Sequence, residues 1–352
     1  MQSFYSLTPD KIATLASPRI LTEQHLNSLY SHVYRKRSPD PTLVTGIPKQ
    51  LIAKLSQYPA GPIKIKTYEQ SKYDHSVKFL FELHDGNCIE TVLMPEANRL
   101  TLCLSSQVGC RQACTFCHTG RLGLIRNLTT AEIVGQVASA LHWIDQNPEW
   151  SVVAKAAPHV KVSNIVFMGM GEPLDNTPAI IDSVKIFCHT AGLQIAMRRI
   201  SVSTSGHLDG MKELFESLPK VSLALSLHSP FEQERSKVMP INRRWSIKEL
   251  LDYIKMKQAQ GTGTVFVQYT LLGGVNDSSD HARALVNLLE GMNVKVNLIP
   301  FNAFSGTLFK APTPEQLAIF RDILHNSSIR VMVRFSKGQD IAAACGQLAN
   351  TK

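Results

Sequence analysis

The chain has 352 residues, 44% of them hydrophobic, so it can bury a sizeable core, and a chain dominated by disorder is excluded. Lysine and arginine outnumber aspartate and glutamate by 37 to 28, which favours polyanionic partners such as nucleic acid, although an ordinary basic protein has the same balance. The N-terminus lacks the apolar run of a secretory signal, and no uncharged apolar stretch is long enough to cross a bilayer, so we expect a cytoplasmic protein with no membrane partner.

Residues 1–85 are predicted to form a small, mainly helical accessory domain that binds RNA. Apolar residues recur at helical spacing over 22–37 and 47–58, and a strand-like alternation follows at 63–68. The basic residues of this domain could contact the phosphates of a folded RNA or could equally form an ordinary solvated surface. They are Arg35, Lys36, Arg37, Lys64, Lys66, Lys72 and Lys78.

Residues 86–352 are predicted to form the main domain, of the α/β class. Strand-like and helix-like stretches alternate regularly, which predicts parallel strands joined by right-handed helical crossovers, as in a partial (β/α)6 TIM-like barrel. Thr129 or Thr130, Ser246 and Thr313 are suitable helix caps. The expected strands cover 100–106, 162–169, 199–205, 221–228, 264–272, 295–302 and 330–335, and the expected helices cover 129–144, 178–190, 246–258, 278–290 and 313–324.

Polar or glycine-rich residues follow several of the expected strands. They occur at 169–172, 203–206 and 226–228 and at Asn302. If the strands form a barrel, these residues line its C-terminal mouth, which is where ligands bind in such folds.

Three of the seven cysteines are closely spaced. Cys110, Cys114 and Cys117 form a CxxxCxxC motif after an apolar strand, and three thiolates can hold three irons of one cubane cluster while the fourth iron stays open to a small molecule. A zinc site is the alternative, but zinc favours four ligands in paired spacings, and His118 directly follows the last cysteine.

The CxxxCxxC motif, with an aromatic residue before its third cysteine, resembles the radical S-adenosylmethionine (SAM) superfamily. A glycine-rich turn, VFMGMGEPL at 166–174, follows a later strand. Gly169 and Gly171 allow close backbone approach to a cofactor, and Glu172 offers an acceptor. Taken alone, such a turn is usually only a turn, but a similar motif contacts the SAM amino group in radical SAM proteins.

The resemblance narrows to the RlmN/Cfr family of radical SAM RNA (adenosine) methyltransferases over about residues 88–348. The motifs that carry it are SSQVGCRQACTFCHTG, RNLT, FMGMGEPL, SVSTSG, SLHSP, MPIN, GVND, VNLIPFN and DIAAACGQL. It implies a 4Fe-4S cluster on the three cysteines, SAM as cofactor, an electron donor such as flavodoxin or ferredoxin, and an RNA substrate, ribosomal or transfer RNA. We expect a monomer.

The resemblance also implies three catalytic residues. Cys345 would accept a methyl group from SAM, and the carbon attached to its sulfur would then add to an adenine ring. Cys103 would release the linked RNA, leaving a transient Cys103–Cys345 disulfide, and Glu90 would remove the substrate proton. Without the resemblance, each of the two cysteines is interpreted as a buried apolar thiol, and Glu90 is interpreted as an ordinary exposed residue of a strand. Cys88 and Cys188 match nothing functional and are interpreted as structural.

The resemblance implies that the SAM-binding residues lie at the ends of the predicted strands. One of them, His228, could equally be a buried histidine whose hydrogen bonds are made within the protein. These positions are Gly171, Glu172, Ser203, Ser226, Leu227, His228 and Asn302.

The predicted function is methylation of carbon 2 of an adenosine in 23S ribosomal RNA, with transfer RNA as a second substrate. The stretches SLHSPFEQERSKVMPIN and RFSKGQDIAAACGQL depart from the commoner family members, so methylation at carbon 8, the antibiotic-resistance type, is an alternative. A non-catalytic RNA-binding scaffold and a radical SAM enzyme acting on a small metabolite also remain open. The intact set of cysteines and the paired Cys103 and Cys345 disfavour both.

Overall fold

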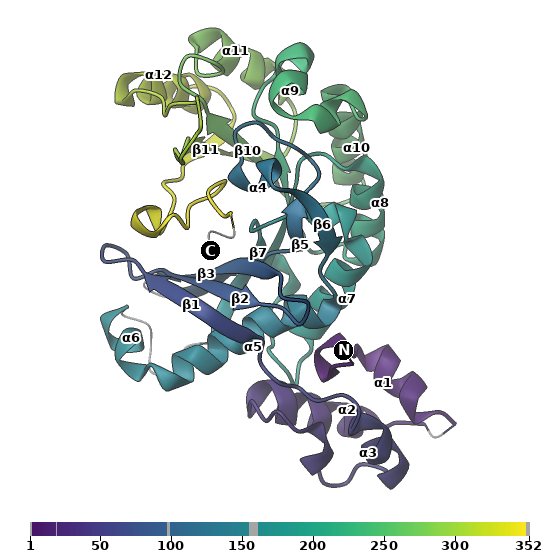
Figure 1. The fold of residues 1–352 in the computed structure, drawn as a ribbon. Coiled ribbons are helices and arrows are strands. Elements are labelled where there is room, and N and C mark those ends of the chain that lie inside the picture. Colours follow the sequence, from purple (N-terminus) through teal and green to yellow (C-terminus); the bar gives the residue numbers. More distant parts are fainter. Residues whose placement is uncertain (1, 19, 97–98, 155–160, 350–352) are drawn as a thin grey trace.

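The computed structural model describes residues 2–18, 20–96, 99–154 and 161–349. One curved sheet of ten strands dominates it, with helices on the outer face (Figure 1). Seven neighbouring strands run parallel, which confirms the predicted run of parallel strands. They are β4 (Arg99–Cys103), β7 (Val162–Phe167), β8 (Ile200–Thr204), β9 (Ser222–Ser226), β10 (Val265–Leu271), β11 (Val294–Pro300) and β12 (Arg330–Val333).

Six β/α units build the parallel part of the sheet, as expected for a partial (β/α)6 barrel. Each helix buries its apolar side in the common core, as α5 does with Ile133, Val137 and Ala140. The third helix, α8, was not predicted, because its ten residues include a glycine and bury only a short apolar stripe. The six helices are α5 (Thr130–Gln146), α7 (Thr177–Cys188), α8 (Leu208–Ser217), α10 (Ile247–Ala259), α11 (Ser279–Leu288) and α12 (Pro314–His325).

The predicted helix caps are confirmed at α5, α10 and α12. Thr129, rather than Thr130, caps α5, and Ser246 and Thr313 cap the other two helices. Each of the three side chains accepts a hydrogen bond from the backbone N–H three residues later, and a side chain at that position bonds back in a capping box. Local sequence therefore determines where these helices begin.

An antiparallel extension continues the sheet beyond β4. Its strands are β1 (Lys64–Gln70), β2 (Val77–Glu82) and β3 (Cys88–Glu96). The strand expected at 63–68 is therefore part of the same sheet as the main domain. The boundary near residue 85 stays a prediction.

The N-terminal segment is helical, as expected. The stretch predicted at 22–37 contains α2 and a π-helical turn at Ser31–Arg35, and the stretch at 47–58 contains α3. Phe4, Tyr30 and Tyr34 pack together in its core. Its α-helices are α1 (Pro9–Ala16), α2 (Glu23–Tyr30) and α3 (Lys49–Leu55).

Short elements complete the described chain. They are the hairpin β5 (Gln107–Cys110) and β6 (Gly123–Asn127), the helices α4 (His118–Arg121), α6 (Pro148–Val153) and α9 (Glu232–Val238), and 3-10 turns at Phe4–Ser6, Pro41–Leu43, Pro173–Asp175, Met197–Arg199, Pro240–Arg243 and Gln339–Ile341.

One of the basic residues expected on an RNA-facing surface lies in the interior. The Lys78 side chain is buried and forms ion pairs with Glu69 and Glu90 at 3.3 and 3.5 Å. Both interpretations placed Lys78 on the surface and are therefore wrong for this residue, because its ion pairs with Glu69 and Glu90 let its charge be buried. Arg35 and Lys36 are exposed, as expected.

Among the described residues, no helix has the length and apolar character needed to cross a bilayer.

Candidate active site

The three motif cysteines lie on a loop over the C-terminal edge of the parallel strands. Cys110 ends β5, Cys114 lies in the following turn, and Cys117 precedes α4. The backbone N–H of Cys117 donates to the Cys114 carbonyl at 3.1 Å, and that of Thr115 donates to the Val238 carbonyl at 3.0 Å. The loop is thus tied to itself and to the end of α9.

All three cysteines line one cavity of about 160 Å³. Burial raises the pKa of each thiol, and the neighbouring thiols raise the pKa of Cys114 further, so the three sulfurs lie close enough to interact electrostatically. Among the described residues, no three His, Cys, Asp or Glu side chains are grouped to hold a single metal ion. Three neighbouring thiols on one cavity are the donor set of a cluster in which each thiolate binds a different iron.

The glycine-rich turn after β7 packs directly on the end of β4. A Cβ at Gly169 would lie 2.7 Å from the Leu104 carbonyl oxygen, and one at Gly171, where φ is +99°, would lie 2.6 Å from the Gln107 Cβ. Both glycines line the cavity. They are therefore needed for close packing of two backbone segments as well as for access to the cavity.

Glu172 joins the ends of β7 and β8. One carboxylate oxygen accepts hydrogen bonds from the Ser205 N–H and hydroxyl at 2.8 and 2.7 Å, and the other accepts from the Leu174 N–H at 3.1 Å. The side chain is buried, and burial raises its pKa, which the hydrogen bonds from Ser205 partly offset. The carboxylate is held at the cavity wall in a fixed orientation.

Four other predicted SAM-binding residues also line this cavity, which brings strand ends far apart in the sequence together. They are Ser203, Ser226, His228 and Asn302. Leu227 does not line it: its side chain is fully buried, its N–H donates to the Gln268 carbonyl at 3.0 Å, and its carbonyl accepts from Arg235.

His228 is a buried, hydrogen-bonded histidine that also faces the cavity, and its role in SAM binding stays a prediction. Its ring lines the cavity, and its Nδ1 accepts a hydrogen bond from the Thr270 N–H at 2.8 Å, which fixes Nδ1 as unprotonated. Burial, helped by the charge of Arg235, lowers its pKa to about 3. The imidazole is therefore neutral at physiological pH.

Arg235 is a positioning residue that sequence reasoning did not identify. It is fully buried on α9 and donates to three backbone carbonyls and one side-chain oxygen at the ends of β8 and β9. Burial lowers its pKa to about 10, so it remains charged near neutrality. The residues around it in the sequence are mostly charged or polar, as in an exposed helix. The sequence therefore showed no sign that Arg235 is buried. The acceptors are Leu227 O, Asn242 Oδ1, Ser205 O and Ser226 O.

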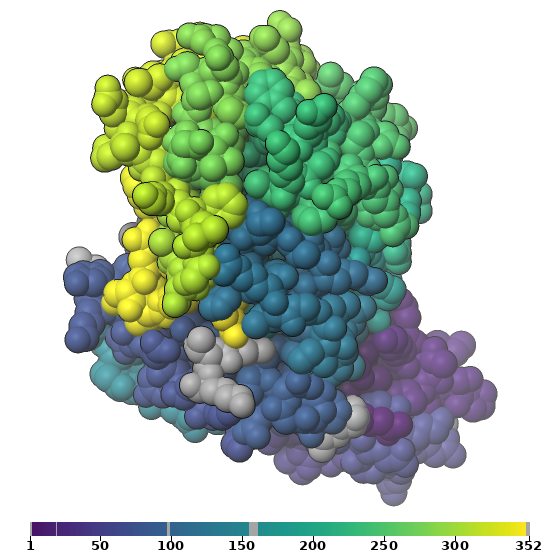
Figure 2. All heavy atoms as spheres, turned by 45° about the horizontal axis from the view of Figure 1, so that its top comes forward, coloured from purple at the N-terminus to yellow at the C-terminus, as the bar shows by residue number. Residues whose placement is uncertain are grey.

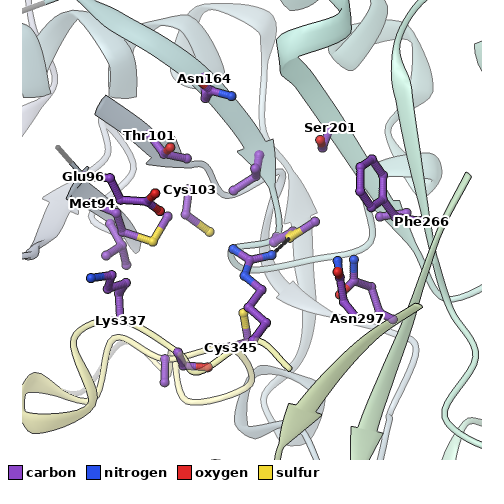
Figure 3. Close-up of a pocket in the computed structure, with 18 of the residues that line it drawn as sticks. Met94, Glu96, Thr101, Cys103, Asn164, Ser201, Phe266, Asn297, Lys337 and Cys345 are labelled. Carbon is purple, nitrogen blue, oxygen red and sulfur yellow. Dashed lines mark hydrogen bonds between the residues drawn. The ribbon is translucent and has the colours of Figure 1, made fainter. Parts of the chain in front are cut away.

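A second cavity of about 610 Å³ runs down the interior of the sheet (Figure 3). Cys103 of β4 and Cys345 of the C-terminal segment both line it, and Cys345 also lines the smaller cavity. Glu96 is its acidic lining residue. Its basic lining residues are Arg99, Arg198, Arg199, Lys295, Arg334 and Lys337.

The C-terminal segment carries Cys345 across the mouth of the sheet. In Figure 2 the yellow C-terminal residues lie beside the blue surface formed by the earlier part of the chain. The Gly346 carbonyl accepts from the His118 N–H at 2.8 Å, and the Leu348 carbonyl accepts from the Thr119 hydroxyl at 2.6 Å. The Asn302 amide donates to the Cys345 carbonyl at 3.3 Å.

Glu90 is brought to the end of this segment and does not line either cavity. It is buried on β3, where one carboxylate oxygen accepts from the Ala349 N–H at 2.7 Å and the other lies 3.5 Å from the Lys78 ammonium. In this structure its carboxylate anchors the C-terminal segment.

The expected disulfide between Cys103 and Cys345 is not supported, because both cysteines, like the other five, are free. Cys103 is buried, whereas Cys345 is exposed. Burial and the nearby Cys345 raise the pKa of Cys103 to about 12, partly offset by Arg334. A thiol at Cys103 is thus protonated in this state.

Comparisons with known proteins agree with this geometry. Residues 104–286 match the radical SAM superfamily. The chain is 39% identical over 354 residues to the dual-specificity RNA methyltransferase RlmN of Campylobacter jejuni, covering 97% of this chain and 95% of the relative. It is 43% identical over 276 residues to RlmN of Desulfotalea psychrophila, covering 78% of this chain and 75% of the relative.

A solved structure is similar over nearly the whole chain. A radical SAM methyltransferase from Sphaerobacter thermophilus superposes with a TM-score of 0.87 and 37% identity, and the match covers 99% of both chains. The similarity therefore includes the N-terminal helices as well as the β/α units.

The buried neutral His228 generates a pH prediction for the cluster-free protein. Because its folded-state pKa of about 3 lies below the ordinary value of 6.5, its contribution to stability is complete above pH 6.5 and is lost as the pH falls from 6.5 toward 3. The loss reaches up to about 4–5 kcal/mol. His228→Asn keeps an acceptor for Thr270 and tolerates the local φ of +58°, so it should lose less stability over this range.

Urea unfolding at several pH values between 7.5 and 4.5 measures this difference. His325→Asn, a change at an exposed helix end, serves as the matched control and should follow the wild-type pH dependence. Identical pH dependence in the wild type and in both variants would contradict a buried neutral imidazole at position 228.

Proposed function

The chain belongs to the RlmN family of radical SAM RNA methyltransferases, and from that premise we propose that it methylates carbon 2 of an adenosine in 23S ribosomal RNA, with transfer RNA as a second substrate. The observation that carries the proposal is the position of Cys345, which lines both the cysteine-lined cavity and the larger basic cavity. A residue that accepts a methyl group from SAM in one cavity and passes its carbon to RNA in the other must line both cavities.

We propose that Cys110, Cys114 and Cys117 hold a 4Fe-4S cluster and that SAM binds beside them. The shared cavity and the electrostatic interaction of the three thiols support this. Gly171, Glu172, Ser203, Ser226, His228 and Asn302 line the SAM side. Leu227 does not line it, and its backbone bonds to Gln268 and Arg235 hold the strand end between Ser226 and His228. When bound, the cluster and SAM supply the one-electron chemistry that a carbon without nucleophilic character requires.

Cys345 is the proposed methyl acceptor. It is exposed, while its own carbonyl is held by Asn302 and that of Gly346 by His118, so its thiol is accessible but its position is defined. The methyl group would pass from SAM to the Cys345 sulfur, and the same carbon would then be joined to the adenine ring. A fixed acceptor reduces the entropy that each transfer step costs.

Cys103 and Glu90 complete the proposed catalytic set. Cys103 faces Cys345 across the larger cavity (Figure 3). This position suits its sulfur, once deprotonated, to attack the Cys345 sulfur: a transient S–S bond would form as the bond from the Cys345 sulfur to the transferred carbon breaks, and that carbon would take up a proton and leave as the methyl group of the RNA. Glu90 is the proposed acceptor of the substrate proton. It lies on the same face of β3 as Val92 and Glu96, which line the cavity, and its present hydrogen bond to Ala349 would have to open for it to act.

The proposed partners follow from the charge and the chemistry. Arg35 and Lys36 are exposed on the N-terminal helical segment and support RNA binding by residues 1–85. The net charge of +9 suits docking of an acidic electron donor such as flavodoxin or ferredoxin. A ribosomal RNA substrate places the activity in the cytoplasm, and the protein is proposed to act as a monomer.

The test of the function is anaerobic reconstitution with iron and sulfide, followed by incubation with reductant, methyl-labelled SAM and unmodified ribosomal RNA. Nucleoside mass spectrometry should detect 2-methyladenosine in the wild type. Cys345→Ala should lose this methylation by at least about three orders of magnitude because no other thiol can replace a covalent acceptor at that position. Its iron content should be unchanged.

The outcomes of this test separate the alternatives. An 8-methyladenosine product would show that carbon 8, not carbon 2, is the methylated position. Absence of both methylated RNA and 5′-deoxyadenosine would favour a non-catalytic scaffold. Methylation by Cys345→Ala at the wild-type rate would refute the covalent route.

The proposed role of Cys103 predicts a trapped complex. Cys103→Ala should form the bond between Cys345 and RNA but fail to release it, so a protein–RNA adduct should accumulate to a level far above that of the wild type. Denaturing electrophoresis with and without nuclease detects the adduct. Cys188→Ala, which alters a cysteine outside both cavities, is the matched control. A Cys103→Ala protein that turns over normally without an adduct would contradict the role.

A further inference from the structure

Two carboxamide side chains lie next to one another in the interior of the parallel sheet. Gln268 of β10 and Asn297 of β11 are directly paired in the strand register, so their side chains leave the same face of neighbouring strands. They are only 4% and 5% exposed. Gln268 Oε1 and Asn297 Oδ1 have no hydrogen-bond partner among the described residues.

Both amides line the larger cavity, and Gln268 also lines the smaller one. They therefore lie near the junction of the two cavities, where Cys345 is found. In Figure 3, Asn297 lies beside the Phe266 ring and on the far side of the cavity from Cys103. Buried polar groups in native proteins are almost always hydrogen-bonded, so an unpartnered adjacent pair needs a ligand to explain it.

The charges around the cavity restrict what that ligand is. Six of its lining residues are basic and one is acidic, so a cationic donor such as an ammonium group is repelled. Arg198 and Arg199 are exposed at the N-terminal ends of the strands, and Lys295 is half-buried near them. The basic end of the cavity is therefore suited to bind phosphates. The two amides lie deeper inside and are suited to bind a neutral group that has both hydrogen-bond donors and acceptors.

Adenine has the matching chemistry. A carboxamide presents one acceptor and one donor group, and its two ends can exchange by rotation, so it pairs in two-point fashion with the amino group and a ring nitrogen of adenine. The half-buried Phe266, two residues before Gln268 on the same face of β10, can stack on the base.

We propose that Gln268 and Asn297 are the specificity-determining pair that recognises the substrate adenine inside the larger cavity, with flanking phosphates held by Arg198, Arg199 and Lys295. This inference rests on the proposed RNA methylation and adds the residues that select the base. The pair holds the ring at the junction with the smaller cavity, where Cys345 can reach it.

The experiment compares two RNA hairpins that differ at the target position, where one carries adenosine and the other carries purine ribonucleoside, which lacks the 6-amino group. The methylation kcat/KM is measured for both with the wild type, Gln268→Leu and Asn297→Leu. With adenosine, each variant should lose about tenfold to a hundredfold in kcat/KM. With purine the loss should be small, so the ratio between the two RNAs should fall toward one.

Two further variants serve as comparisons. Asn297→Asp keeps an acceptor for the 6-amino group at nearly the same volume, so it should retain more of the preference for adenosine than Asn297→Leu does. Gln260→Leu changes an exposed amide at the end of α10 and should keep the wild-type ratio. Methylation of Cys345 by SAM, which needs no RNA base, should proceed in Asn297→Leu and Asn297→Asp as in the wild type.

The outcomes distinguish this inference from the proposed function. If the wild type methylates neither RNA, the proposed function fails and the inference fails with it. If the wild type methylates adenosine and the leucine variants keep its preference over purine, only the recognition pair is overturned. If Asn297→Leu loses Cys345 methylation, Gln268→Leu decides: an unchanged preference for adenosine over purine there overturns the pair, and a reduced preference supports it.

Discussion

The active-site arrangement depends on one constraint, the fixing of a short C-terminal segment across the open mouth of the sheet. Hydrogen bonds to His118 and Thr119, which follow the motif cysteines, to Asn302 and Ala303 after β11, and to Glu90 on β3 hold it. Each contributes about 0.5–1.5 kcal/mol. Together they place an exposed cysteine where it lines both cavities.

The rest of the fold supplies the surroundings of that cysteine. Parallel strands bring their C-terminal ends to one edge, so Glu172, Ser203 and Ser226 converge although they are distant in sequence. Arg235 then fixes the ends of β8 and β9 by donating to their carbonyls from a fully buried position. Without the guanidinium, several buried carbonyl groups would lose their hydrogen-bond donor. Replacing Arg235 by a neutral residue would therefore destabilise the fold.

Sequence patterns predicted the parallel strands, five of the six helices and the caps Thr129, Ser246 and Thr313, because these depend on local periodicity and hydrogen bonding. The same reasoning placed Lys78 on the surface, since a basic residue in a strand carries no mark of its ion pairs with Glu69 and Glu90. Arg235 and the Gln268–Asn297 pair were not identified for a similar reason: their significance comes from strand register and from partners distant in sequence.

The central claim is that Cys345, and no other cysteine, is the methyl acceptor. The most direct measurement is peptide mass spectrometry of the reconstituted protein after incubation with methyl-labelled SAM and reductant, with all seven cysteines covered. The account predicts one labelled methyl group on the Cys345 sulfur, present before any RNA is added. Labelling of Cys103 in place of Cys345, or a protein that methylates RNA while Cys345 never carries the label, would contradict it.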